Sequence, residues 1–209
     1  MIRYFWVLRA YALRAGELTG LGPRIFFCSA TEIVRVLTGA TIGAAVLVER
    51  ERAYEGYRRL PSYPVLIRGR FDPYAWASDP DRRSDVFVEG VRRPVSETVQ
   101  GFPGSAGVVT GRVRRLTDVS EGAELRAGEV LVNTVTNVGW TPLFPRVAAV
   151  VTDVGAPLSH AAIVAREIGI PAVVGCGNAT MRLQTGDLVR VDGTAGTVEL
   201  LNRAGTPAG

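Results

Sequence analysis

Residues 150–175 read VVTDVGAPLSHAAIVAREIGIPAVVG, and this stretch decides the fold class. The β-branched residues at its start predict a strand over 147–152, which leads into a loop that contains glycine. Ser159 is a favourable N-cap and Gly169 a favourable left-handed terminator for a helix over 161–168. The short apolar run at 172–174 predicts another strand. Strand, loop, helix and strand in this order indicate an α/β domain.

The rest of the chain shows two different sequence patterns, one before residue 61 and one after residue 100. After residue 100, short β-branched segments separated by glycine predict further strands over 107–116, 130–135, 188–191 and 197–201, with a hairpin turn over 192–196. The first 60 residues have helical periodicity. A capping box of Ser29 and Glu32 begins one helix that Gly39 ends, and another helix is expected over 44–59.

Residues 61–100 are expected to be a connector, and the domain boundary is placed within them. Their prolines at 61, 64, 73, 80 and 94, together with the polar stretch SDPDRR at 78–83, are more typical of a linker than of a core. The predicted division is a helical segment with this proline-rich connector over 1–95, followed by the α/β domain over 96–203.

Composition excludes several classes of chemistry. The 209 residues include no lysine and one histidine, His160, so a phosphate-loop lysine, a Schiff-base lysine and any site with two histidines are ruled out. The net charge of +4 comes from arginines that alternate with glutamates, which indicates a solvated helix face and no nucleic-acid site. Cys28 and Cys176 lie far apart and suggest a reducing compartment.

We expect a cytoplasmic protein that does not enter a membrane. The longest apolar run, near residues 42–48, is far shorter than the about 20 residues that a spanning helix requires. No targeting segment is visible, because arginines at 9 and 14 interrupt the apolar N-terminal stretch and no cleavage pattern follows it.

His160 lies where the predicted helix begins, and this position suits a phosphoryl group. Backbone N–H groups of a first helical turn are unpaired, and with the helix dipole they favour an anion there. They also disfavour an imidazolium, so a neutral imidazole would keep a lone pair for nucleophilic attack. The small residues Ala161 and Ala162 would let a bulky partner approach closely.

Less specific interpretations of His160 are also open on the residues alone. A lone histidine near a helix start can be a polar residue at the edge of a loop. A metal site is not expected, because no second histidine or cysteine pair accompanies it. A serine hydrolase is disfavoured, since Ser159 has no other histidine as its base and is more simply a cap. Arg166 is expected to form a salt bridge and to take no part in catalysis.

Residues 155–175 resemble the phosphohistidine signature of the mobile, swivelling domain of the phosphoenolpyruvate-utilising enzymes. The resemblance extends over about residues 100–201. It includes SAGVVTGR at 105–112, GEVLV at 128–132, WTPLF at 140–144 and the stretch from GD at 186–187 to GTV at 196–198. It implies an α/β fold of the β/β/α swivelling type, preceded by a small, mainly helical domain.

The resemblance also implies an activity and a set of site residues. His160 would be the phosphorylated residue of a dikinase-type, ATP-dependent phosphotransferase, carrying the group from one active site to another. Ser159, Gly155, Thr136, Asn137, Trp140 and Thr141 would bind the phosphoryl group or line the loop beside it. The connector would act as the hinge of the swing.

The phosphoryl donor is expected to come from elsewhere. The chain contains no glycine-rich loop with a lysine, no region of ATP-grasp size and no barrel for phosphoenolpyruvate. We therefore expect that it binds no cofactor itself and that a separate ATP-grasp subunit binds ATP and Mg²⁺. The chain is either the phosphocarrier of such a split enzyme or the C-terminal portion of a larger one. The acceptor would be a hydroxyl of a small molecule.

Two departures from the family pattern bear on this assignment. Leu158 stands where pyruvate-linked members usually have threonine, and residues 136–138 read Thr-Asn-Val where Thr-Asp-Pro is usual. The WTPLF element and the missing threonine favour the rifampicin phosphotransferase-like branch, and helical segments before residue 61 resemble the same relatives. The asparagine weakens the role that the family's loop aspartate would have, although it can still donate to a phosphate oxygen. A fragment of a pyruvate- or phosphoenolpyruvate-linked synthase is one alternative, and a non-catalytic docking or regulatory module is another.

Overall fold

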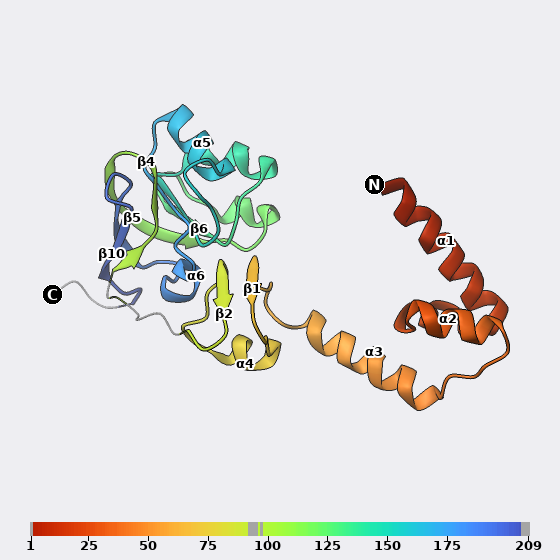
Figure 1. Ribbon diagram of the computed structural model, residues 1–209. Coiled ribbons are helices and arrows are strands. Elements are labelled where there is room, and N and C mark those ends of the chain that lie inside the picture. Colours follow the sequence, from red (N-terminus) through yellow and green to blue (C-terminus); the bar gives the residue numbers. More distant parts are fainter. Residues whose placement is uncertain (1, 92–95, 97, 206–209) are drawn as a thin grey trace. The chain divides into compact units, whose positions relative to one another are not determined.

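The computed structural model describes residues 2–91, 96 and 98–205. The chain divides into two compact units, Met1–Leu60 and Pro61–Gly209, which we call the helical unit and the sheet unit (Figure 1). The boundary expected between residues 95 and 96 adjoins residues 92–95, which lie outside the described residues, and so it stays a prediction. Along the described ranges, no helix is both long and apolar enough to cross a membrane.

The helical unit confirms the helices that the sequence predicts. Ser29 Oγ accepts from Glu32 N, and Glu32 Oε2 accepts from Ser29 N at 2.7 Å, which is the predicted capping box. Arg50 also donates to both oxygens of Glu32, at 2.8 and 2.9 Å, and this ion pair with the bond from Ser29 lowers the pKa of Glu32 to about 2. The elements are α1 (Ile2–Thr19), the 3-10 helix η1 (Gly22–Phe27), α2 (Ala30–Leu37) and α3 (Ala44–Arg58).

Residues 61–91 are more ordered than their composition suggests. A parallel pair of short strands, β1 (Leu66–Arg68) and β2 (Val86–Val88), flanks the helix α4 (Pro73–Ser78). Four aromatic rings of this segment pack together, with neighbouring centroids 5.0–6.2 Å apart: Tyr63, Phe71, Trp76 and Phe87. The aromatic residues are irregularly spaced among prolines, so no periodicity reveals that they form a small core of their own.

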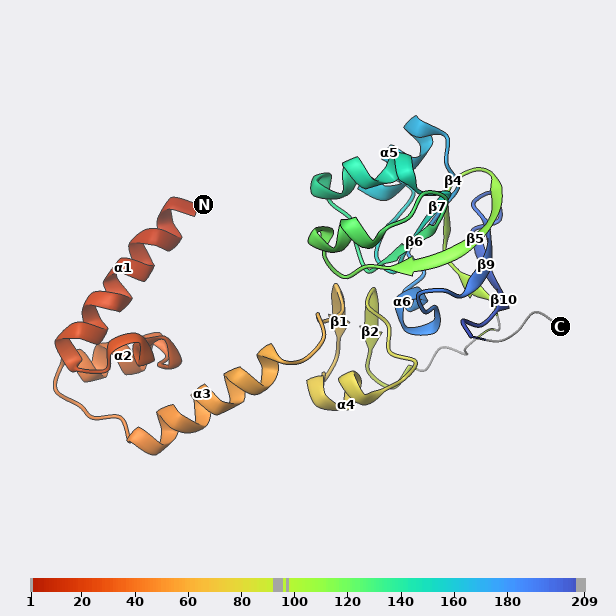
Figure 2. The same ribbon diagram turned by 180° about the vertical axis from the view of Figure 1, so that it is seen from behind.

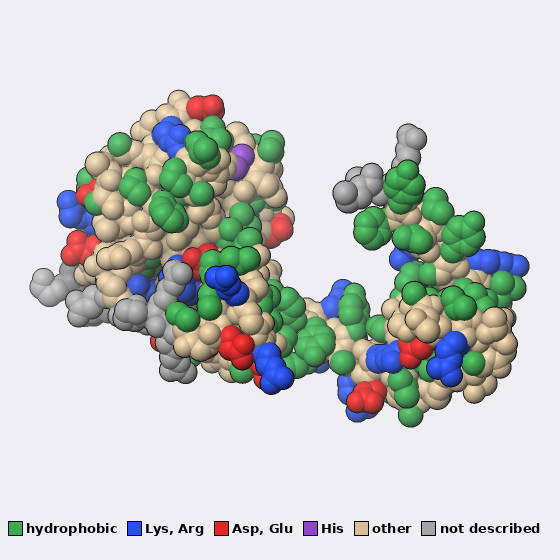
Figure 3. Space-filling view, in the orientation of Figure 1, with side chains coloured by type: hydrophobic (Ala, Val, Ile, Leu, Met, Phe, Trp, Pro, Cys, Tyr) green, Lys and Arg blue, Asp and Glu red, His purple; other side chains and the backbone are tan. Residues whose placement is uncertain are grey.

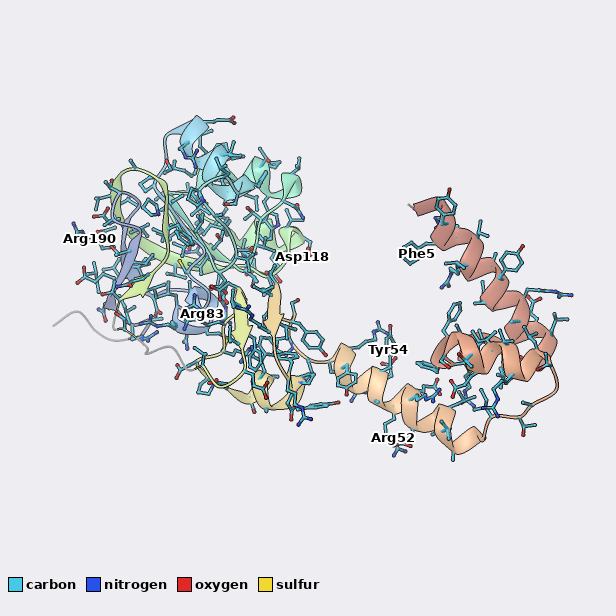
Figure 4. The ribbon with its side chains drawn as sticks, viewed as in Figure 1. Phe5, Arg52, Tyr54, Arg83, Asp118 and Arg190 are labelled. Carbon is cyan, nitrogen blue, oxygen red and sulfur yellow. The ribbon has the colours of Figure 1, made fainter. Side chains whose placement is uncertain are left out.

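This segment is hydrogen-bonded to a loop in the rest of the sheet unit. Ser84 N donates to Gly177 O at 2.7 Å. The guanidinium of Arg83, labelled in Figure 4, lies so close to Gly177 that a Cβ there would be 2.0 Å from Nη2. Arg83 is held in place by Asp85, with Nη2 2.7 Å from Oδ2. Glycine at position 177, whose φ is 79°, lets the guanidinium lie directly against the backbone of this loop.

The main sheet has eight strands among the described residues, in the order β3-β10-β9-β5-β6-β7-β8-β4. Strands β5, β6, β7 and β8 run parallel to one another, as the α/β expectation requires, and the other pairs of the sheet are antiparallel (Figures 1 and 2). Only Gly101 separates β3 from β4, although these strands form opposite edges, so the sheet curls until its edges meet. The strands are β3 (Val99–Gln100), β4 (Phe102–Ser105), β5 (Val108–Arg115), β6 (Val130–Asn133), β7 (Ala149–Thr152), β8 (Ala172–Val174), β9 (Leu188–Asp192) and β10 (Thr197–Asn202).

The predicted strands of this sheet are confirmed to within a few residues, and two clusters form its core. Strands β6, β7 and β8 are buried along their whole length, as parallel central strands are. Val130 and Val132 pack into one cluster, whereas Leu131 between them packs into the other, together with α5 and η3. The helices of the sheet unit are η2 (Val119–Glu124), η3 (Val138–Arg146), α5 (His160–Ile168) and α6 (Ala179–Arg182).

Candidate active site

His160 is the first residue of α5, and the loop 153–159 carries the chain to it from the end of β7. The helix begins one residue earlier than predicted and ends at Gly169, whose φ of 74° is the left-handed conformation expected there. Ala161, Ala162 and Ala165 are buried against the sheet. The imidazole is half-buried and can be seen at the surface in Figure 3. The helix is thus anchored along its inner face while its first side chain is accessible.

Both ring nitrogens of His160 have a threonine hydroxyl beside them. Thr136 Oγ1 lies 3.2 Å from Nδ1, and Thr141 Oγ1 lies 3.2 Å from Nε2. Thr136 is buried, at 8% exposure, whereas Thr141 is exposed. Phe144 packs edge-on against the imidazole, with centroids 5.9 Å apart and planes at 85°. The ring is therefore oriented from three sides, and the structure places two of the predicted site residues in direct contact with it.

Two other predicted site residues have their side chains engaged elsewhere. Asn137 Oδ1 accepts from Gly139 N at 2.9 Å and so caps η3. Trp140 is 4% exposed and belongs to the core cluster beneath η3. Both residues shape the segment that presents Thr136 and Thr141.

Two buried hydroxyls near His160 make no hydrogen bond among the described residues: that of Thr152, the last residue of β7, and that of Ser159, the last residue of the loop. Ser159 occupies the N-cap position as predicted, but its side chain makes no capping bond. A Cβ at Gly155 would lie 3.0 Å from Ser159 Oγ and 3.2 Å from Thr152 Oγ1. Glycine at 155 leaves space between these hydroxyls, and its φ of 158° favours glycine as well.

Arg166 fastens the same loop to the neighbouring strand. Its Nε donates to Gly104 O at 2.7 Å, and its Nη2 donates to Pro157 O. The expected salt bridge is wrong: both partners are backbone carbonyls, to which Arg166 lies closer than to any carboxylate of the described residues. The sequence could not show this, because β4 and the loop meet only in the folded chain.

Asp153, the first residue of the loop 153–159, is fully buried and was not predicted as a site residue from the sequence. Its carboxylate accepts from Thr180 N at 3.1 Å and from the Thr180 hydroxyl, while its carbonyl accepts from Gly177 N at 2.8 Å. Burial raises the pKa of Asp153 to about 6, against the lowering effect of the bonds from Thr180. Asp153 therefore connects the loop that presents His160 to the start of α6.

Asp153→Asn is expected to flatten the pH dependence of stability between about pH 4 and pH 6. The pKa of Asp153 in the folded chain lies above the ordinary aspartate pKa of 3.8, so in this interval the folded chain binds a proton that the unfolded chain has lost. The free energy of unfolding should then fall with rising pH, by about 3 kcal/mol at about 1.4 kcal/mol per pKa unit. Asparagine cannot ionise, so urea unfolding of the variant at several pH values should lack this decrease. If the variant shows the same pH profile as the unsubstituted chain, Asp153 is not the group whose raised pKa causes the decrease.

The described residues contain no group of three or more His, Cys, Asp or Glu side chains that could hold a metal ion. What the site does provide is one oriented imidazole, two contacting hydroxyls and the unpaired N–H groups of the first turn of a nine-residue helix. This chemistry suits a nucleophile that receives an anionic group.

Comparison with known proteins gives one family and several long relatives. Residues 125–196 match the mobile domain of the PEP-utilising enzymes. The chain is 36% identical to a rifampicin phosphotransferase of Streptomyces sviceus over 205 residues, which are 96% of this chain and 22% of the relative. Over 179 residues it is 46% identical to the rifampicin phosphotransferase of Bacillus cereus, covering 85% of this chain and 19% of the relative. A phosphoenolpyruvate synthase of Aeropyrum pernix is 50% identical over 101 residues, 48% of this chain and 12% of the relative. The chain thus spans about a fifth or less of the length of these relatives.

Proposed function

The chain belongs to the PEP-utilising enzymes through its mobile domain, and we propose that this domain carries a phosphoryl group on His160 from an ATP site to an acceptor hydroxyl. The observation that supports the proposal most directly is the placement of the imidazole. The single histidine of the chain opens a helix, is accessible, and has a hydroxyl 3.2 Å from each ring nitrogen. The names of the relatives, phosphotransferase and synthase, agree with group transfer.

The first step would be a displacement at phosphorus. The lone pair of an imidazole nitrogen forms a P–N bond while the P–O bond to the nucleotide breaks, and the nucleotide oxygen takes the electron pair. The transferred group would then lie at the first turn of α5, where unpaired N–H groups and the hydroxyls of Ser159 and Thr141 can donate to its oxygens. Dividing the transfer in two lets one histidine serve two separate sites.

In the second step the acceptor oxygen attacks phosphorus, the P–N bond breaks and the imidazole recovers its electron pair. The hydroxyl proton of the acceptor is lost to solvent or to a base of the acceptor site. ATP and Mg²⁺ would be bound by an ATP-grasp subunit or by another part of a larger enzyme, because this chain has no lysine for a phosphate loop. The small-molecule hydroxyl is favoured as acceptor by the two rifampicin phosphotransferases.

Thr141→Val and Thr136→Val are each expected to slow phosphorylation of His160 about tenfold, because the ring loses one of the contacts that orient it. Valine keeps the shape of threonine, so folding should be preserved, and Thr110→Val on the exposed surface of β5 is the matched control. The ¹⁵N shifts of the single imidazole should also change in the first two variants, since each hydroxyl biases the ring tautomer. Wild-type rates and shifts in both would show that the hydroxyls are incidental.

The function is tested with two phosphoryl donors. Potassium phosphoramidate, a small donor, is added to the full chain. ATP and Mg²⁺ are added to a chimera in which the 179-residue matching stretch of the Bacillus cereus relative is replaced by this chain. ATP labelled at the β or the γ position is used in separate reactions. We expect an acid-labile, alkali-stable label on the peptide that contains His160, and none on that peptide in His160→Ala.

The outcomes separate the alternatives. A label that persists in His160→Ala, or its absence with both donors, would overturn the proposal and favour a non-catalytic module. Transfer from the labelled chimera to rifampicin would support a hydroxyl acceptor. Formation of phosphoenolpyruvate when the full chain, first labelled by phosphoramidate, is mixed with pyruvate and the Aeropyrum pernix synthase would favour the synthase alternative.

A further inference from the structure

The first three turns of α1 carry large apolar side chains that are mostly exposed. Each of five such side chains is 65–76% exposed: Tyr4, Phe5, Trp6, Leu8 and Tyr11. We call these five residues the α1 patch. Figure 3 shows hydrophobic side chains gathered along this helix. Monomeric proteins seldom expose so many large apolar side chains together, and a patch of this kind marks an interaction site.

A groove of about 500 Å³ forms part of the same surface and belongs entirely to the helical unit. It is lined by Phe5, Trp6, Leu8, Arg9 and Ala12 of α1 and by Phe26 of η1. Arg9 is the one charged residue of this lining, and its Cζ lies 5.0 Å from the centroid of the Phe26 ring, so its charge rests on an aromatic face. Phe5, labelled in Figure 4, projects from α1. The surface therefore contains both protruding rings and a hollow that can receive one.

The spacing of these residues makes the surface complementary to itself. Because an α-helix has 3.6 residues per turn, positions 4, 5, 8, 11 and 12 fall on one side of α1. A two-fold axis beside Leu8 would run a second copy of α1 antiparallel to the first, and positions 4 and 12 are equally far from position 8. The rings of Tyr4 and Phe5 in each copy would then face the small Ala12 and the groove of the other copy.

The charges of α1 do not oppose this pairing. The charged positions 3, 14 and 17 fall on other sides of the helix, and Arg14 and Glu17 neutralise each other, with Nη1 2.8 Å from Oε2. Arg9 lies at the edge of the apolar side, where salt screens the repulsion between the two copies of its guanidinium. Apolar surfaces need no opposite charges to associate, because contact removes them from water.

We infer that the α1 patch is the interface between two copies of this chain, which pack α1 against α1 about a two-fold axis. The inference goes beyond the phosphoryl transfer proposed for His160 and does not depend on it. The five residues of the patch and Phe26, which is 44% exposed, offer about 700 Å² per copy to a partner, at about 200 Å² for a large side chain. A stable interface buries about 800 Å² per partner, so the patch is of the size that a dimer needs.

Other occupants fit the α1 patch less well. A lipid surface binds helices that have a strongly charged face, whereas α1 has four charged residues among 18 and two of these pair with each other. A small apolar ligand would fill the groove and leave Tyr4 and Tyr11 in water, because neither residue lines the groove. A second copy covers both the groove and the rings beside it.

The inference is tested by the mass of the full chain in solution and by charges placed at the two-fold axis. Sedimentation equilibrium of the unsubstituted chain at about 50 μM should give twice the mass of one chain. Leu8→Glu and Leu8→Arg should each weaken association at least about tenfold, because residue 8 of one copy meets residue 8 of the other and like charges repel. An equimolar mixture of the two variants should form a dimer again, since the charges that meet are then opposite.

The matched control is Val34→Glu, which adds a charge at a side chain that is 61% exposed on α2 and should leave the dimer unchanged. Circular dichroism of every variant should match that of the unsubstituted chain, because the substituted side chains are exposed. Phosphorylation of His160 by phosphoramidate should also be unchanged, since α1 and α2 belong to the helical unit and His160 belongs to the sheet unit.

Each result has a distinct meaning. A monomeric unsubstituted chain would overturn the inference. Its sedimentation with vesicles of phosphatidylcholine and phosphatidylserine, or with the Bacillus cereus relative from which the matching stretch is removed, would then identify a lipid surface or a further protein segment as the occupant. A dimer that persists in both Leu8 variants, or that Val34→Glu abolishes equally, would also overturn it. So would Leu8 variants that stay monomeric when mixed, because residue 8 would then not meet its own copy. Failure of phosphoryl transfer to His160 would disprove the proposed function and leave the dimer standing.

Discussion

Replacing Phe144 by alanine is expected to lower the free energy of unfolding of the sheet unit by about 3–5 kcal/mol. Phe144 is fully buried in the cluster that joins η3 and α5 to the sheet, where Leu131, Val150 and Ala162 also pack. Alanine would leave a cavity that the rigid central strands cannot fill. The ring also packs edge-on against His160, with centroids 5.9 Å apart, so the same variant should slow phosphorylation by phosphoramidate.

Phe144→Leu separates the two effects. Leucine fills most of the space, so most of the stability should return, but it has no aromatic edge to orient the imidazole. Urea unfolding followed by circular dichroism measures the first effect, and the phosphorylation rate measures the second. Wild-type stability in Phe144→Ala would show that this cluster is not the core that supports α5.

Gly193→Ala is expected to destabilise the sheet unit by about 3 kcal/mol or more, because a methyl group there has no space. A Cβ at this position would lie 1.9 Å from Ser105 O and 2.9 Å from Ala172 N. Both are backbone atoms, of β4 and β8, and neither can move without disturbing the pairing of those strands. Gly193 N also donates to Gly107 O at 2.8 Å, which fixes the turn against the start of β5.

Gly43→Ala serves as the control for Gly193→Ala. Its Cβ would make only an ordinary contact, 3.9 Å from Val46 Cγ2, so the change should alter stability little. The free energy of unfolding of each variant is measured in urea and compared with that of the unsubstituted chain. A Gly193→Ala variant as stable as the control would mean that β4 and the 192–196 turn do not pack as closely as the structure shows.

Local patterns predicted most of the regular structure of the sheet unit. Strands such as 172–174 and 130–133 are short β-branched runs bounded by turn residues, and Gly169 ends α5 because glycine adopts a positive φ without cost. Strand β4 was missed because its sequence, FPGS, has neither β-branched residues nor alternation. It forms a strand because the edge of β8 offers it backbone partners.

The candidate site likewise contains residues that were predicted from the sequence and residues that only the structure revealed. His160, Ser159, Thr136 and Thr141 were singled out from the chain itself or from its resemblance to a family. Phe144, Thr152 and Asp153 were missed as site residues, because an apolar residue in a 3-10 helix or a polar residue at a strand end does not indicate what it will contact. A hydroxyl within the otherwise apolar run AVVT at 149–152 is the one signal that could have identified Thr152.

The sequence by itself determined the α/β character of the second half, the helix that His160 opens, and the chemistries that a chain without lysine cannot perform. These depend on local spacing and on residue types, which the chain specifies one segment at a time. Only the tertiary structure decided which hydroxyl meets each ring nitrogen and that residues 61–91 pack around aromatic rings. Those arrangements join residues far apart in the chain, and they arise when the sheet curls and its two faces are covered.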